Sequence, residues 1–248
     1  MKFRSALLAA LAGALLNLPA AADRRTMIRA YEFETQPEGN LELEIWNDVN
    51  APKSAFADAL IIQRIELEYG ITDRWDVALY HVFQQGGPAG AEDRGFHLDS
   101  WRLESRYRLA ERGEWPVDVM VYLEMERPAA LGEPWELEEK IILERDFGRL
   151  AVIANLVAEQ KLAGGDRAGH NWEIDFGLRY DLGHLIRVGA EIWGVQQIAL
   201  DGTRDIALYA GPSMSIAVKK FWLQLGAGAG LNDAAGQVQI RSVIGFNL

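Results

Sequence analysis

Charged side chains recur at every second position along several short stretches of this sequence, between apolar neighbours. Arg102, Glu104, Arg106 and Arg108 follow this spacing in one stretch. A period of two places such residues on one face of a β-strand. Acids and bases that share a surface can pair, whereas an excess of acids can line a path for cations. Either chemistry requires strands held side by side.

His97, Asp99 and Ser100 supply the residue types of a serine nucleophile, its base and an orienting acid. In a strand, however, Ser100 faces away from the other two side chains. Chance clustering at a loop edge is the favoured interpretation, so we predict no catalytic residues and keep lipid hydrolysis as a third alternative. The four histidines show no metal-ligand spacing and there is no cysteine, so we predict no metal and no cofactor.

The run from Gly226 to Gly230 has the glycine content of a phosphate-binding loop but lacks the helix that such a loop precedes. We interpret it as a strand whose inward glycines make room for bulky side chains opposite or ease the curvature of the strand. Pro212, which lacks an N–H, predicts a bulge or a break in the hydrogen-bond ladder of its strand.

Alternation of apolar and polar residues runs through nearly the whole chain, as in Leu41–Ile45, Val117–Glu126 and Trp172–Tyr180. It gives a sheet with one apolar and one charged face, which is typical of a barrel with lipid outside and a polar lumen. We therefore predict an all-β fold, a transmembrane antiparallel up-and-down β-barrel of about twelve strands. The predicted strands are 40–50, 58–71, 74–85, 96–110, 117–128, 135–147, 149–162, 171–182, 184–197, 204–219, 221–232 and 237–248.

The connections between these strands alternate between short turns and mostly longer loops, the pattern of outer-membrane barrels with periplasmic turns and outer loops. This assignment puts the C-terminus on the periplasmic side. The predicted lumen-lining residues are the charged residues on the inward face: Glu42, Glu44, Arg64, Glu66, Glu68, Arg102, Glu104, Arg106, Arg108, Asp118, Glu124, Glu126, Glu136, Glu138, Lys140, Glu144, Glu173, Asp175, Arg179, Arg187, Glu191 and Arg241.

Aromatic residues on the outward face fall near the strand ends, as expected for rings that settle at the level of lipid headgroups. The predicted outer belt is Trp101, Trp135 and Trp172, and the predicted periplasmic belt is Tyr69, Trp75, Tyr107, Tyr180 and Phe246. A soluble β-sandwich is the alternative, but it explains neither the belts nor the two classes of loop. Glu139 is the main charge on the outward face.

Residues 1–22 have a positive start, an apolar run and a small-residue cleavage site, so we predict a signal peptide and export. Its removal leaves 23 Lys and Arg against 36 Asp and Glu, which changes the net charge from −11 to −13. So acidic a protein would repel nucleic acid, and we predict no nucleic-acid partner. We predict that residues 23–39 form an N-terminal lead-in before a barrel domain of residues 40–248. Met27 to Thr35 is either an extra strand or a tail in the lumen.

The hairpin from Glu66 to Tyr80, the turn Pro37-Glu38-Gly39 and the ending Val243 to Leu248 resemble a group of Gram-negative outer-membrane barrels. That group includes the "MetA-pathway of phenol degradation" proteins and similar transporters. The resemblance implies an outer-membrane location, lipid and the barrel-insertion machinery as partners, the latter through the C-terminal strand, and passage of small, hydrophobic or aromatic molecules. The group has no catalytic residues to transfer, and Leu248 replaces the aromatic residue at which many such barrels end.

Two functions remain open at this point. One is passive or weakly selective passage of an unidentified small solute through a narrow acidic lumen. The other is a closed structural or scaffold barrel braced by an internal salt-bridge network, for which Arg102, Arg106 and Arg108 would pair with Asp118, Glu124 and Glu126 of the next strand.

Overall fold

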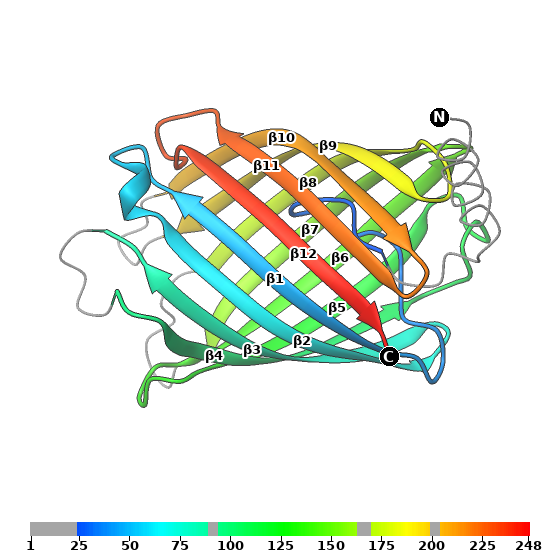
Figure 1. Ribbon diagram of the computed structural model, residues 1–248, viewed down its shortest axis with the longest axis horizontal. Helices are drawn as coiled ribbons and strands as arrows, with labels where there is room; N and C mark the ends of the chain where they lie inside the picture. The colour runs from blue at the N-terminus through cyan, green and yellow to red at the C-terminus, as the bar shows by residue number, and fades with distance from the viewer. Residues whose placement is uncertain (1–23, 89–93, 163–169, 199–203) are drawn as a thin grey trace, which may run out of the picture.

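The computed structural model is a closed barrel of twelve antiparallel strands (Figure 1). It describes residues 24–88, 94–162, 170–198 and 204–248, so the predicted signal peptide lies outside the described residues. The strands are β1 (Leu41–Ala51), β2 (Leu60–Thr72), β3 (Trp75–Gly86), β4 (His97–Arg108), β5 (Asp118–Pro128), β6 (Trp135–Phe147), β7 (Leu150–Leu162), β8 (His170–Asp181), β9 (Ile186–Ile198), β10 (Arg204–Val218), β11 (Phe221–Gly230) and β12 (Val238–Asn247), with a 3-10 turn η2 (Phe56–Asp58) after β1.

Each strand pairs with the next along the chain, and β1 pairs with β12 to close the barrel. The predicted fold class and strand number are confirmed, and the predicted strand ends differ from the observed ones by at most two residues. Closure leaves no unpaired sheet edge, which a barrel in lipid requires.

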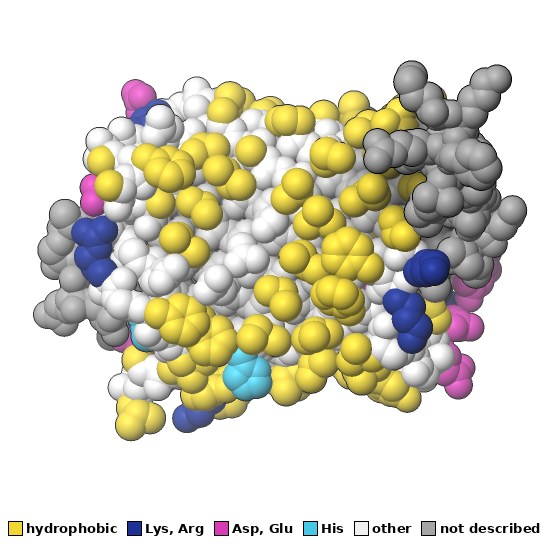
Figure 2. Space-filling model, in the orientation of Figure 1, with side chains coloured by type: hydrophobic (Ala, Val, Ile, Leu, Met, Phe, Trp, Pro, Cys, Tyr) yellow, Lys and Arg dark blue, Asp and Glu magenta, His cyan; other side chains and the backbone are white. Residues whose placement is uncertain are grey.

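The strand period separates two environments. On β5 and β6 the outward Leu123 and Ile141 are 49% and 46% exposed, whereas the inward Tyr122 and Ile142 are 3% and 0% exposed. Figure 2 shows apolar side chains over the barrel wall and most of the charged side chains near its two ends. Among the described residues, no helix has the length and apolar character to cross a membrane.

The two ends of the barrel differ in their connections. We call the end with the connections β2–β3, β4–β5, β6–β7, β8–β9 and β10–β11 the short-turn end, and the opposite end the long-loop end. β12 runs toward the short-turn end, so the C-terminus lies there (Figure 1).

A break in one ladder is confirmed at Pro212. β10 pairs with β11 at Ala210–Ala229 and again at Ser213–Gly226, and the two residues between have no partner on β11. The register is the same on both sides of the gap, so the ladder between β10 and β11 is interrupted without a bulge.

Candidate functional site

Residues 24–36, which we call the plug, lie inside the barrel (Figure 1, dark blue). Arg24 Nη1 donates to the Leu185 carbonyl at 2.8 Å, and Thr35 Oγ1 donates to the Asp73 carbonyl at 2.8 Å. Both carbonyls belong to turns at the short-turn end. Between them, Ile28 and its neighbours reach Glu191 in the middle of β9. The segment is a tail in the lumen and not an extra strand, and it enters and leaves at the same end.

The plug has no regular secondary structure, so its buried N–H groups need other acceptors. Glu191 supplies one carboxylate to three consecutive N–H groups, those of Ile28, Arg29 at 2.9 Å and Ala30 at 3.1 Å. Asn155 accepts from the Tyr31 N–H at 2.5 Å and donates to its carbonyl at 3.0 Å. Wall side chains thus replace the backbone partners that a strand would have.

Glu144 and Asp76 bind the returning half of the plug. Glu144 Oε2 accepts from the Phe33 N–H at 2.7 Å, and Asp76 Oδ2 accepts from the Gln36 N–H at 2.9 Å. Three acidic residues of the wall, Glu191, Glu144 and Asp76, therefore accept from the backbone of residues 28–36.

Charged side chains of the plug also pair with the wall. Arg29 Nε donates to Glu173 at 2.7 Å, and Glu32 accepts from Arg179 at 2.8 Å. Arg25 is 3.8 Å from Glu44. Each of these wall residues is at most 8% exposed, and a buried charge that loses its partner is costly.

Arg112, in the β4–β5 turn, holds the plug at the short-turn end. Its guanidinium lies 3.2 Å from Glu34, 2.7 Å from Glu144 and 2.9 Å from Asp146. Burial alone would lower the pKa of Arg112, but the carboxylates, led by Glu34, hold that pKa above its ordinary value. Arg112 also donates to the Phe33 carbonyl at 2.5 Å, so one turn residue contacts both the backbone and a side chain of the plug.

Inward glycines of β9 and β11 form the part of the barrel wall that the plug contacts. A Cβ at Gly226 would be 2.4 Å from Ile28 Cγ1, and a Cβ at Gly189 would be 2.9 Å from Met27 Sδ. A Cβ at Gly228 would meet the Trp193 ring at 1.9 Å. The interpretation that the glycines of β11 make room for bulky neighbours is confirmed, and one of those neighbours is the plug itself.

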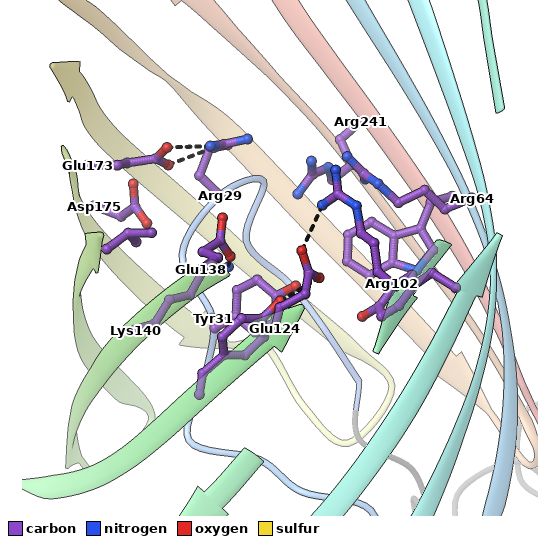
Figure 3. Close-up of a pocket in the computed structure, with 14 residues that line it drawn as sticks. Arg29, Tyr31, Arg64, Arg102, Glu124, Glu138, Lys140, Glu173, Asp175 and Arg241 are labelled. Carbon is purple, nitrogen blue, oxygen red and sulfur yellow. Dashed lines mark hydrogen bonds and ion pairs between the residues drawn. The ribbon is translucent and has the colours of Figure 1, made fainter. Parts of the chain in front are cut away.

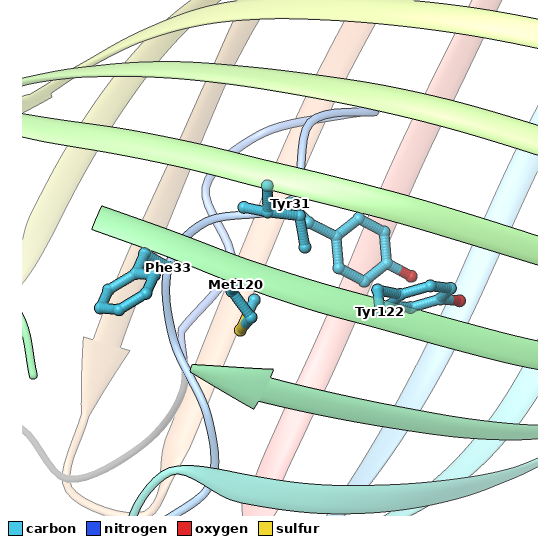
Figure 4. Packing of buried hydrophobic residues seen from close by; sticks show 5 residues of the cluster. Tyr31, Phe33, Met120 and Tyr122 are labelled. Atoms are coloured by element: carbon cyan, nitrogen blue, oxygen red, sulfur yellow. The ribbon is translucent and has the colours of Figure 1, made fainter. Parts of the chain in front are cut away.

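Apolar contacts complete the fit on the opposite wall. Tyr31 and Phe33 pack with Met120, Tyr122 and Ile142 of β5 and β6 (Figure 4). The Tyr31 and Tyr122 rings meet edge-on at 5.1 Å. The plug is therefore packed as a core segment.

All the predicted lumen residues lie on the inner side of the wall and none is exposed. Half-buried members are Arg64, Arg102, Arg108, Glu126, Glu136, Glu138, Lys140 and Arg187. Fully buried members are Glu42, Glu44, Glu66, Glu68, Glu104, Arg106, Asp118, Glu124, Glu144, Glu173, Asp175, Arg179, Glu191 and Arg241.

The predicted pairing of β4 with β5 is correct for one arginine only. Arg102 lies 3.0 Å from Glu124 and 2.7 Å from Glu126. Arg106 instead turns to β3, where Asp76 is directly opposite and 2.7 Å away, and it also binds Glu68 of β2.

The other two members of that predicted pairing bind backbone groups. Arg108 donates to the Asp73 carbonyl in the β2–β3 turn. Asp118 accepts from the Gly113 N–H at 2.6 Å in the β4–β5 turn. The prediction was wrong for these residues because each strand of a barrel has two neighbours, and turn backbone competes for charges near the strand ends.

Two small cavities remain on the long-loop side of the plug, of about 60 Å³ and 80 Å³. Arg29, Arg64 and Arg241 line both of them. Figure 3 shows the 60 Å³ cavity, with Arg64, Arg102 and Arg241 on one wall facing Glu173 and Asp175 on the other. Cavities of this size hold only a few water molecules.

Asp48 is a buried lumen residue that the sequence-based set omitted. It binds Arg64 Nη1 at 2.6 Å and Arg241 Nε at 2.5 Å. It has the same strand parity as Glu42 and Glu44, so the alternation of β1 contained the signal. The contacts of Asn155 with the plug had no such signal.

The residues considered for hydrolysis do not form an accessible site. Ser100 is fully buried on the lumen side of β4, and its hydroxyl donates to Asp99 at 3.3 Å. A nucleophile buried there is not exposed to lipid. Within residues 24–88, 94–162, 170–198 and 204–248, no group of three or more His, Asp or Glu is arranged to hold a metal ion.

The predicted belt residues all lie on the outer side of the barrel. Seven of them are 40% to 52% exposed, namely Trp135, Trp172, Tyr69, Trp75, Tyr107, Tyr180 and Phe246. Trp101 is half-buried.

This architecture is that of bacterial outer-membrane β-barrels. It is similar to an outer membrane channel from Pseudomonas putida F1, with a TM-score of 0.62 and 17% identity over 90% of this chain and 100% of that chain. The KdgM porin has a TM-score of 0.59 and 9% identity, covering 84% of this chain and 99% of its own. The NanC porin has a TM-score of 0.58 and 9% identity, covering 83% and 100%. These likenesses concern the fold. No protein-family model matches the chain, and the comparison with curated proteins finds no match.

Proposed function

We propose that the protein is an outer-membrane channel for small solutes that the plug closes in the conformation described, and that passage requires the plug to move. One observation carries this proposal. The lumen is occupied by a segment that belongs to no strand, so it can leave without breaking any hydrogen bond of the barrel ladders.

The belts, the apolar outer wall and the predicted signal peptide support an outer-membrane location. The short-turn end would face the periplasm, and the C-terminal strand would be read by the barrel-insertion machinery. The structural neighbours include channels and porins, which agrees with solute passage. Hydrophobic or aromatic solutes, as in the phenol-degradation group that the sequence resembles, are the solute class we would test first.

A closed structural barrel is the second candidate, and ion pairs between strands favour it. Two ion pairs join neighbouring strands on the lumen side without any plug residue: Arg106 with Asp76, and Arg102 with Glu124. If such pairs alone close the lumen, the plug only adds stability, and removing it does not open a path through the barrel.

Planar-bilayer recording separates the two candidates. The mature chain is compared with a variant that lacks residues 24–36, and heat-modifiable mobility verifies that each barrel is folded. The channel proposal expects rare or no steps for the mature chain and frequent ion-conducting steps for the deletion. A folded deletion variant without conductance would establish the structural barrel.

A locked variant is the matched control. Thr26 Oγ1 lies 3.0 Å from Ser215 Oγ, so cysteines at these two positions can join the plug to β10. Because the chain has no cysteine of its own, no other disulfide can form. We expect any residual conductance to vanish on oxidation and to return on reduction.

A further inference from the structure

Arg127, near the long-loop end of β5, is an exposed arginine on the lipid-facing side of the barrel. Its guanidinium lies 5.8 Å from the centre of the Trp101 ring and 5.9 Å from that of Trp135. The register explains this, because Trp101 is directly opposite Arg127 on β4 and Trp135 begins the strand on the other side. The arginine therefore lies between two tryptophans of the belt at that end.

The environment of Arg127 differs from that of the lumen arginines. Arg102 and Arg106, for example, have carboxylate partners at 3.0 Å or less. Arg127 has no carboxylate partner in the part of the chain that the structure describes, although the chain as a whole carries a net charge of −11. A lipid-facing cation at the level of the aromatic belt is placed to meet an anionic headgroup.

An apolar groove of about 590 Å³ lies on the same face, on the bilayer side of Arg127. It exists because small side chains, Ser105 and Ala158, stand among larger ones such as Leu123 and Ile141. Leu123 is four residues from Arg127 along β5, about 13 Å of strand. The groove therefore lies at the depth of acyl chains that hang from a headgroup at Arg127.

Glu139 is the charged residue in this groove that faces lipid. It is exposed and has no hydrogen-bond or ion-pair partner among the described residues. A carboxylate in an apolar setting is unfavourable unless a donor reaches it. A hydroxyl or amide on an acyl chain in the groove would supply such a donor.

We propose that this face binds a phosphorylated lipid whose acyl chains carry hydroxyl or amide groups. Its phosphate lies on Arg127 between Trp101 and Trp135, one acyl chain fills the groove, and a donor on that chain bonds to Glu139. The site rests on the proposed outer-membrane location but not on channel activity, because it lies outside the lumen and touches no part of the plug.

Native mass spectrometry of the folded mature chain in detergent micelles tests the site. The probes are diphosphoryl lipid A, phosphatidylglycerol and phosphatidylcholine, which differ in phosphate charge and in acyl hydroxyl and amide groups. We expect diphosphoryl lipid A to bind most tightly. Arg127→Gln should weaken its binding about five-fold, the factor that one arginine contributes near anionic lipid, and Arg127→Lys should lose less.

Arg94→Gln is the matched control. Arg94 is an exposed arginine at the same end, but it pairs with Asp58 at 3.9 Å, and its loss should leave lipid binding unchanged. Equal binding of diphosphoryl lipid A by wild type, Arg127→Gln and Trp135→Leu would overturn the proposal, and heat-modifiable mobility shows that each variant is folded.

Glu139→Leu tests the acyl-chain contact separately. It should weaken the binding of diphosphoryl lipid A by roughly five-fold, as expected for one lost hydrogen bond, and leave the binding of phosphatidylglycerol unchanged. If Glu139→Leu affects neither lipid, or if phosphatidylglycerol binds as tightly as diphosphoryl lipid A, the assignment of a hydroxylated or amide-bearing chain is wrong. Conductance of the plug-deleted barrel is a separate readout, so the two proposals can fail independently.

Discussion

Glu191→Gln should release the plug, because one carboxylate accepts from three consecutive N–H groups of that segment. Glu191 is 5% exposed, so water screens these bonds little. A hydrogen bond to a charged group contributes about 1.5–3 kcal/mol. Glutamine keeps one acceptor oxygen but turns an NH2 group toward the remaining donors. We therefore expect closure to weaken by about 2–4 kcal/mol, which raises the open population by about 30- to 1000-fold.

The absence of cysteine gives a direct assay for this change. Ala30 is 6% exposed in the closed plug, so a cysteine in its place reacts with a water-soluble maleimide only when the plug opens. When opening and closing are fast compared with labelling, the labelling rate follows the open population. We expect labelling of Ala30→Cys to accelerate at least ten-fold when Glu191→Gln is added.

Glu126→Gln is the matched control for this experiment. Glu126 also lies on the lumen wall, and it binds Arg102 at 2.7 Å on the long-loop side of the plug. It should leave the labelling rate of Ala30→Cys unchanged. Equal rates in the two variants would refute the view that the Glu191 carboxylate holds the plug.

Three further outcomes follow from contacts described above. Gly226→Leu should expel the plug, because the new side chain would overlap Ile28, and should raise bilayer conductance. Gly194→Leu is the control, since a Cβ at Gly194 would meet nothing closer than 3.6 Å, and it should leave conductance unchanged. Equal conductance of the two variants would contradict the packing argument. Arg106→Met leaves buried carboxylates unpaired and should lower the free energy of unfolding by about 3–5 kcal/mol. The measurement is the urea midpoint of the vesicle-inserted barrel, which should fall. An unchanged midpoint would count against that ion pair. Glu139→Leu removes a charge from the lipid-facing wall and should stabilise the inserted barrel by about 1–2 kcal/mol, and a lower midpoint in pure phosphatidylcholine would be the opposite result.

The strands were predictable because a period of two is a local signal that lipid on one side and a packed lumen on the other impose on every strand. Leu123 and Tyr122 occupy opposite faces for this reason, and the predicted ends of their strand are within one residue of those observed. The closure of β1 on β12 followed from the fold class.

The sequence does not decide between the two alternatives for the plug, because its conformation is set by partners far along the chain. Its N–H groups bind Glu191 and Glu144, more than a hundred residues away, whereas the alternation from Tyr31 to Glu34 also fits a short strand. The pairing of Arg106 with Asp76 was within reach of the sequence, since β3 and β4 form a hairpin that places them opposite each other. It was missed because only the following strand was considered.

The plug joins β1 through residues 37–40, a link of four residues that reaches about 14 Å when extended. A displaced plug therefore stays beside the opening it came from, at an effective concentration in the millimolar range. Reclosure is then a first-order event whose rate does not depend on how many copies the membrane holds. Each molecule would open and close independently of the others, and no second protein would be needed to close it again.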